Sequence, residues 1–231
     1  MRGPDDDHMN EGVYARIKIH LMTQPPVPGQ LLQIGALAAE LGVSTTPVRE
    51  ALTRLAAERL IVCAPRKGFF AKTPSEEEIR GLHSVNQTLL DSALDRWSWN
   101  DESVPHHLDS PMNWRAHAGQ CAHLLVNRTA ELFSCIAMRS GIAELTQVVH
   151  NISDRLHHPR LVECEIIDDT REVVLKMCDL YAAENHRDLR LVLRSYHETR
   201  LKLITPVCKE LLVRSFLSEE YAESHTLRQR R

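Results

Sequence analysis

Short polar side chains and one arginine gather at the start of a predicted helix, where they could contact the phosphates and base edges of DNA. Ser44, Thr45 and Thr46 carry hydroxyl groups that can approach phosphate oxygens, and the N-terminus of a helix adds unpaired backbone N–H donors. Arg49 follows one turn later, where a guanidinium can bond O6 and N7 of guanine bidentately, at roughly 1–3 kcal/mol of base discrimination. These residue types at this spacing predict a DNA recognition helix.

A second basic group, Arg66 and Lys67, lies in a predicted turn between two short apolar runs. Side chains at the tip of such a turn can enter the minor groove of DNA or grip its backbone. We add Pro47, Gly68 and Arg54 to the candidate DNA-binding residues. An arginine at position 54 is also consistent with a solvated surface charge, as are Arg59 and Lys72.

Three helices and two short strands are predicted to position these residues, over 11–22, 34–41, from Ser44 onward, 60–63 and 68–71. Gly42 favours the left-handed end of the second helix, and Ser44 is a suitable N-cap with Pro47 tolerated in the first turn. The third helix has an apolar stripe at helical spacing, formed by Val48, Ala51, Leu52 and Leu55. Three helices followed by a hairpin with a basic tip predict a winged helix–turn–helix.

A domain boundary is predicted at 73–76, where Pro74 ends the first domain and Ser75 with Glu78 forms a capping box for a new helix. Only helices are predicted beyond it, over 76–100, 113–139, 142–157, 165–184, 187–213 and 216–224. The fold is therefore expected to be mainly α, with a disordered leader over 1–9, a winged helix–turn–helix over 10–74 and an all-helical domain over 75–231.

Composition restricts the function classes. The formal net charge is −3, so affinity for nucleic acid must come from a local patch, and residues 30–74 carry six Lys/Arg against three Asp/Glu. No run of about 18 uncharged apolar residues occurs, and the acidic start is unlike a secretory signal. No CxxC occurs among the six widely spaced cysteines, so we expect reduced thiols and a cytoplasmic protein without membrane partners.

Residues 37–52, 54–61 and 65–68 resemble the GntR family of regulators, and their Thr-Pro-Val-Arg-Glu-Ala-Leu core is specific to it. The resemblance covers about 65 residues. It implies that the recognition helix and the wing bind a double-stranded DNA operator as a symmetric homodimer. The sequence departs from the family pattern at Thr45, where an arginine is common. One phosphate or base contact is therefore expected to be missing.

The helical half resembles the FadR-like subgroup in its helix layout and in residues 77–82, 139–141 and 195–197. That resemblance implies a bundle that makes the dimer and binds a small-molecule effector. Many members hold a divalent metal with one Asp and three His, but the corresponding positions here are Thr129, Phe133, Thr170 and His197. Only the last is a ligand type, so we expect no metal. Asn86 replaces an arginine that contacts anionic effectors, and we take Asn86 and His197 as candidate effector-binding residues.

Two other function classes stay open at this point. One is a DNA-binding adaptor whose helical domain binds another protein, which shares the same DNA-binding half. The other is a metal-dependent enzyme in a helical bundle, although the Glu-x-x-His motifs of such enzymes are absent. Further histidines, including His117, His123 and the pair His157–His158, are interpreted either as surface residues or as an alternative metal site.

Overall fold

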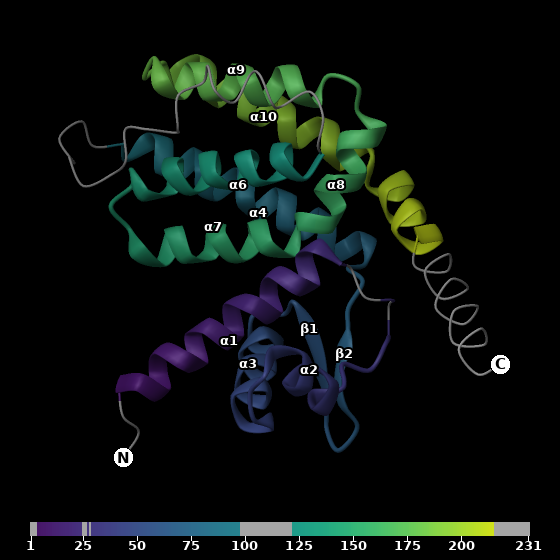
Figure 1. Cartoon of the computed structure of the whole chain (residues 1–231). Coiled ribbons are helices and arrows are strands. Elements are labelled where there is room, and N and C mark those ends of the chain that lie inside the picture. Colours follow the sequence, from purple (N-terminus) through teal and green to yellow (C-terminus); the bar gives the residue numbers. More distant parts are fainter. Residues whose placement is uncertain (1–3, 25–26, 28, 98–121, 215–231) are drawn as a thin grey trace. The chain divides into compact units, whose positions relative to one another are not determined.

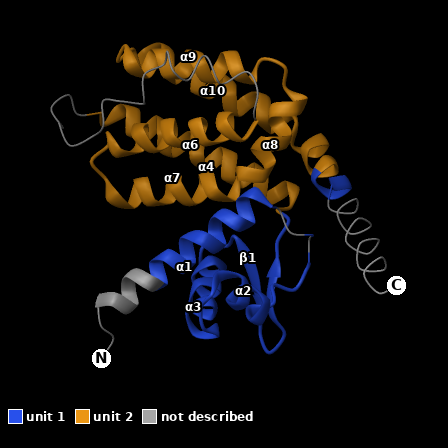
Figure 2. Ribbon diagram, in the orientation of Figure 1, with its two compact units in different colours: residues 1–73, 211–231 blue, residues 74–210 orange. Residues whose placement is uncertain are grey.

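The computed structural model describes residues 4–24, 27, 29–97 and 122–214. The chain divides into two compact units, residues 1–73 with 211–231 and residues 74–210 (Figure 2). The division therefore falls between Thr73 and Pro74. It groups the last residues with the first unit, whereas the sequence assigned all of 75–231 to the helical domain. None of the described helices is long and apolar enough to cross a membrane.

Unit 1 is a three-helix fold with a β-hairpin (Figure 1). It consists of α1 (Pro4–Thr23), α2 (Ile34–Leu41), α3 (Thr45–Ala57), β1 (Ile61–Ala64) and β2 (Gly68–Ala71). The strands pair antiparallel, with Ile61 opposite Ala71 and Ala64 opposite Gly68. The segment before α2 adds to the other edge of β2, because Leu32 N–H donates to Phe69 O at 2.8 Å and Ala71 N–H donates to Gln30 O at 2.9 Å.

The predicted apolar stripe of α3 forms the centre of the unit 1 core. Its four residues are at most 4% exposed, and they pack against residues of α1, α2 and the hairpin, among them Val13, Ile17, Ala38, Ile61 and Phe69. Burying several such side chains contributes about 1.5–3 kcal/mol each. This packing fixes which side of α3 faces outward.

The first helix is longer than predicted. It begins at Pro4 rather than at about residue 11, so residues 4–9 are helical where a disordered leader was expected. The sequence is compatible with the extension, because proline is well suited to the first position of a helix. Residues 1–3 lie outside the described residues.

Unit 2 is built from helices in its described part (Figure 1). They are α4 (Glu76–Asp95), α6 (Ala122–Met138), α7 (Ala143–Arg155), α8 (His157–Ile166), α9 (Thr170–Ala182) and α10 (His186–Lys202). The predicted cap of α4 is present, since Glu78 N–H donates to the Ser75 hydroxyl at 3.2 Å. The central helix is α6, which packs against α4, α7, α8 and α9.

The helix boundaries differ from the prediction in three places. The first helix of unit 2 ends at Asp95, not at 100, and the long last helix is interrupted at Leu203 before helical residues 204–214. Residues 158–164, which lie between the predicted helices 142–157 and 165–184, belong to α8. Proline is tolerated in the first turn, where the backbone N–H has no partner within the helix. The predicted stretch 216–224 lies outside the described residues.

Candidate nucleic-acid interface

The turn between α2 and α3 has the sharp geometry that a helix–turn–helix requires. Gly42 has φ +69°, in the left-handed region that glycine adopts without steric cost. Two backbone bonds close the end of α2, from Gly42 N–H to Ala39 O at 3.3 Å and from Val43 N–H to Ala38 O at 3.0 Å. Ala38 is buried where α2 packs against α3, so a small residue does support the close packing of the two helices.

The N-terminus of α3 presents free polar groups. Ser44 is the N-cap residue in extended conformation, yet its hydroxyl makes no capping hydrogen bond within the described residues. Pro47 at the third helical position has no N–H, which removes one of the two usual donors to a capping hydroxyl. Thr45 and Thr46 are also exposed. The start of the helix therefore offers hydroxyls and unpaired N–H groups to an anion.

Arg49 is exposed on the same helix, on the side away from the buried stripe. Pro47, predicted as a DNA-binding residue, is instead buried with Val48 in unit 1. That prediction is corrected: the Pro47 side chain belongs to the packed side of the helix and shapes the interface only by leaving Ser44 uncapped.

Arg54 is paired with other residues of unit 1. Its Nη1 donates to Glu11 Oε2 at 2.6 Å and its Nε to Glu58 Oε1 at 3.1 Å, while its Cζ lies 3.8 Å from the centroid of the Tyr14 ring. Tyr14 in turn donates its hydroxyl to Glu58 Oε2 at 2.6 Å. Arg54 therefore links α3 to α1, while its side chain stays 48% exposed, and its role as a DNA contact stays a prediction.

This network between α1 and α3 was missed from the sequence. Glu11 and Tyr14 lie far from Arg54 along the chain, and only the i, i+4 spacing of Arg54 and Glu58 was a visible signal. A further link joins the same two helices, since Asn10 Nδ2 donates to Glu50 Oε2 at 3.1 Å. These contacts orient the recognition helix without touching its outer side.

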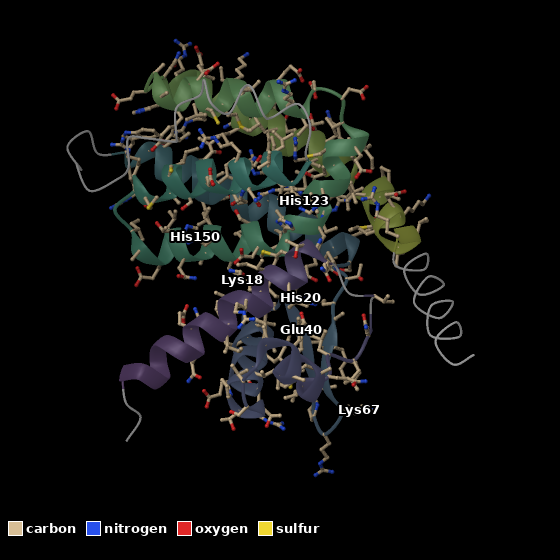
Figure 3. All side chains as sticks on the ribbon, in the orientation of Figure 1. Lys18, His20, Glu40, Lys67, His123 and His150 are labelled. Atoms are coloured by element: carbon tan, nitrogen blue, oxygen red, sulfur yellow. The ribbon has the colours of Figure 1, made fainter. Side chains whose placement is uncertain are left out.

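The wing is a tight turn with basic residues at its tip. Lys67 N–H donates to Ala64 O at 3.0 Å, Pro65 occupies the second position and Arg66 has φ +63°. This arrangement is typical of a type II turn, whose third position usually holds glycine. Arg66 and Lys67 are both exposed, and Lys67 is labelled at the hairpin tip in Figure 3.

Gly68 supports the wing through its backbone. Its φ is +113°, and a Cβ atom there would lie 3.1 Å from Leu31 Cδ1. The glycine is therefore required by strand geometry and by the approach of the 29–32 segment. The structure brings Arg66, Lys67 and the start of α3 into one unit as exposed polar groups, and their contacts with DNA stay a prediction.

The two candidate effector residues, Asn86 on α4 and His197 on α10, contact each other in the core of unit 2. Both are 0% exposed, and Asn86 Nδ2 lies 3.2 Å from His197 Nε2. The other ring nitrogen, Nδ1, lies 2.8 Å from Leu193 O and therefore carries the proton. Burial lowers the pKa of His197 to about 3, and the charges of His83, Arg160 and Arg200 act in the same direction. His197 is neutral, with Nε2 accepting from Asn86.

The positions that correspond to the other metal ligands of the FadR-like subgroup hold no strong donor. The Thr129 hydroxyl donates to Leu125 O at 2.9 Å, and Phe133 stacks on His197 with 5.7 Å between ring centroids. Thr170 is buried at 4% exposure. In the described part of the chain no group of three or more His, Cys, Asp or Glu residues is arranged to hold a metal. The expectation that the protein binds no metal stays a prediction.

Other histidines differ from the surface residues expected. His157 is 7% exposed, and its ring centroid lies 5.8 Å from that of His123. His83 is fully buried and its Nε2 lies 3.0 Å from Glu163 Oε1. The surface interpretation was therefore wrong for His157, and His83 was not considered. His117 lies outside the described residues.

The described cysteines, at 63, 135, 164, 178 and 208, are free thiols.

A buried ionic cluster forms around Glu163 in unit 2. Glu163 pairs with Arg200, whose Nε lies 2.9 Å from Glu163 Oε2, as well as with His83. Burial alone would raise the pKa of Glu163, but the neighbouring His83, Arg200 and Arg160 lower it to about 2. The carboxylate is thus ionised in the core, a state that only paired positive groups can stabilise.

Comparison with known proteins finds sequences and structures that are similar to this chain. Residues 9–70 match the model of "Bacterial regulatory proteins, gntR family". The chain is 28% identical over 138 residues to the Nta operon transcriptional regulator of Aminobacter aminovorans, an alignment that takes in 59% of this chain and 66% of that relative, just under two thirds of its length.

Two solved structures share the fold. A GntR transcriptional regulator from Rhodococcus sp. RHA1 superposes with a TM-score of 0.68 at 20% identity, over 86% of this chain and 98% of that one. The E. coli protein McbR/YncC superposes with a TM-score of 0.63 at 19% identity, over 85% and 97% of the two chains. Both likenesses extend beyond the winged helix–turn–helix into the helical half. The Nta operon protein and the Rhodococcus protein are named as transcriptional regulators, not enzymes.

Proposed function

Residues 9–70 belong to the gntR family of bacterial regulatory proteins, and from that premise we propose that the chain is a sequence-specific, DNA-binding transcriptional regulator. It acts in the cytoplasm as a homodimer on a palindromic operator, with an affinity that a small molecule modulates. The observation that carries the proposal is the division of α3 into two sides. One side is buried in the core of unit 1, and the other presents Ser44, Thr45, Thr46 and Arg49.

In the proposed complex the hydroxyls and N–H groups at the start of α3 bind a phosphate, which sets the register of the helix. Arg49 then reaches the base edges in the major groove, where a guanine offers two acceptors to its guanidinium. Arg66 and Lys67 of the wing hold the adjacent backbone or minor groove. The net charge of −3 means that attraction to DNA depends on these few groups, not on the charge of the whole chain.

The homodimer and the effector are inferred from the family and from the architecture. Two copies related by a two-fold axis would present two recognition helices to the halves of a palindrome. An effector that binds one arrangement of the dimer better than another would change operator affinity. A coupling of about 1–3 kcal/mol gives 5–150-fold control.

The test is selection of bound sequences from a random duplex library with the full-length protein, with sedimentation velocity on the resulting complex. We expect a palindrome to be enriched and two chains to bind per duplex. A library that gives salt-sensitive binding without any enriched sequence would contradict sequence-specific regulation. An enriched site without two-fold symmetry would contradict the homodimer alone.

A further inference from the structure

Arg160 is a buried cation without a hydrogen-bonding partner in the described part of the chain. It lies on α8 and is 2% exposed, and its Nε, Nη1 and Nη2 atoms have no acceptor among the described residues. Its Cζ atom lies 5.1 Å from the ring centroid of Phe133. A ring face attracts a cation weakly and does not satisfy the N–H groups of a guanidinium, which normally find acceptors when buried.

Among the described residues, the charges near Arg160 do not balance. His83 Nε2 lies 3.0 Å from Glu163 Oε1 and Arg200 Nε lies 2.9 Å from Glu163 Oε2. Arg200 also donates Nη1 to Tyr196 O at 3.1 Å. Two buried guanidinium groups therefore face one buried carboxylate, and the neutral His197 contributes no negative charge. A buried charge is normally paired, because its loss of hydration is costly. Arg160 is the surplus positive charge of this cluster.

Asn86 and His197 were the effector-binding residues expected from the sequence, but they bind each other. The stacked rings of Phe133 and His197 instead connect that pair with Arg160. A guanidinium has the planar donor fork that matches a carboxylate or phosphate through two parallel hydrogen bonds. An anion bound here would satisfy the nitrogen atoms of Arg160 and cancel the surplus charge.

We propose that Arg160 binds the oxyanion group of a small molecule, a carboxylate or a phosphate, in the core of unit 2, and that this molecule is the effector of the regulator. The binding step follows from the cluster itself. The regulatory step rests on the proposed function, since it requires an operator whose affinity can change. The proposed anion contacts Arg160 and not the Asn86–His197 pair, because Asn86 Nδ2 and His197 Nε2 already bind each other.

The test uses thermal unfolding of the full-length protein in chloride buffer, with added sodium phosphate or a series of sodium carboxylates such as acetate, succinate and benzoate, all at constant ionic strength. A ligand that binds only the folded state raises the unfolding midpoint in a saturable way, by several degrees at about 100 times its dissociation constant. The arm that responds identifies phosphate or carboxylate as the preferred group.

The decisive variant is Arg160→Met, which keeps an unbranched side chain of broadly similar volume and removes the charge. Because it removes an unpaired buried charge, we expect its midpoint in chloride to equal or exceed that of the wild type, and its anion response to be lost. Arg190→Met is the matched control. Arg190 is an arginine of α10 already paired with Asp91 and Asp95, so this variant should keep the response.

Three results would overturn the proposal. They are an unchanged wild-type midpoint with every anion, an anion response that persists in Arg160→Met, or a large loss of stability of that variant in chloride, which would show a purely structural role. Measuring operator binding on the same samples separates the two claims. Operator binding without an anion response defeats this inference alone, whereas an Arg160-dependent anion response without operator binding defeats the proposed function alone.

Discussion

The Ser44 hydroxyl at the start of α3 makes no capping hydrogen bond within the described residues. Ser44 has the conformation of an N-cap, but Pro47 supplies no N–H for it to bind. The serine hydroxyl is therefore left to water or to a ligand phosphate. Thr45, next to it, is the position at which this sequence lacks the arginine that GntR regulators commonly have.

Replacing Thr45 by arginine should strengthen binding to DNA of any sequence. The side chain is exposed at the first turn of α3, where an added cation would lie close to a phosphate. Each added phosphate contact steepens the dependence of log K on log salt by about 0.9. Titrations of a random duplex at several salt concentrations measure this slope. An unchanged slope would contradict the placement of this helix end at the DNA backbone. Thr88→Arg, at an exposed threonine of α4 in unit 2, serves as the control.

His197 should make the protein sensitive to mild acid. Burial lowers its pKa from 6.5 to about 3, so between these values the unfolded chain binds a proton that the folded chain does not. Stability is therefore lost as the pH falls below about 6.5. Between pH 7 and pH 5 the loss from this group is about 2 kcal/mol at most. Urea unfolding of the wild type and of His197→Gln at both pH values measures the difference, and equal losses in both proteins would refute it.

Residues whose role depends on short-range pattern were predictable, and those whose role depends on distant partners were not. Arg49 is exposed, as expected from its place relative to the apolar stripe. The contacts of the Arg54 side chain depend on Glu11 and Tyr14 of α1, which no local spacing in the sequence connects to it. For the same reason the pairing of Asn86 with His197, and the isolation of Arg160, became visible only in the folded chain.

Among the elements, the wing contains a residue whose backbone conformation lowers stability and whose side chain is proposed to bind DNA. Arg66 has a φ of +63° in the turn, a conformation that costs a non-glycine residue roughly 1–2 kcal/mol. That cost is understandable if the side chain contacts DNA, because glycine would serve the turn better.

Arg66→Gly is expected to stabilise unit 1 by about 1 kcal/mol and to weaken DNA binding. Arg66→Ala should weaken binding to the same extent without the gain in stability, because it keeps the Cβ atom. Thermal unfolding and duplex titration of both variants measure the two effects separately. If Arg66→Gly bound DNA as tightly as the wild type, the wing tip would have no place in the interface.

The elements of unit 1 were predictable because each is bounded by a residue with a clear local effect. Gly42 ends α2, and Ser44 begins α3. Helix α8 escaped prediction, although Pro159 is compatible with the first turn of a helix. The pairing of residues 29–32 with β2 also escaped, since the Pro-rich segment before it shows no strand pattern.

For the whole molecule, the resemblance of the helical half to a metal-binding subgroup does not extend to its ligands. Thr129, Phe133 and Thr170 stand where stronger donors would be expected, and the nitrogen of His197 that faces Asn86 is occupied.

Removal of divalent ions should leave the protein unchanged. Dialysis against a chelator is expected to alter neither the thermal unfolding midpoint nor operator affinity, because the metal-ligand set is incomplete. Elemental analysis of the purified protein provides the independent measurement. One tightly held divalent ion per chain, with loss of stability on its removal, would refute this prediction.

The central claim is that the exposed side of α3 reads bases, and it is tested most directly by measuring the affinities of two arginine variants for a panel of single-base-substituted operators. Arg49→Ala should flatten the preference at one base position in each half-site, by roughly 1–3 kcal/mol. Arg54→Ala should lower the free energy of unfolding but keep every base preference, since Arg54 is bound to Glu11 and Glu58. Full base preference in Arg49→Ala would contradict the account.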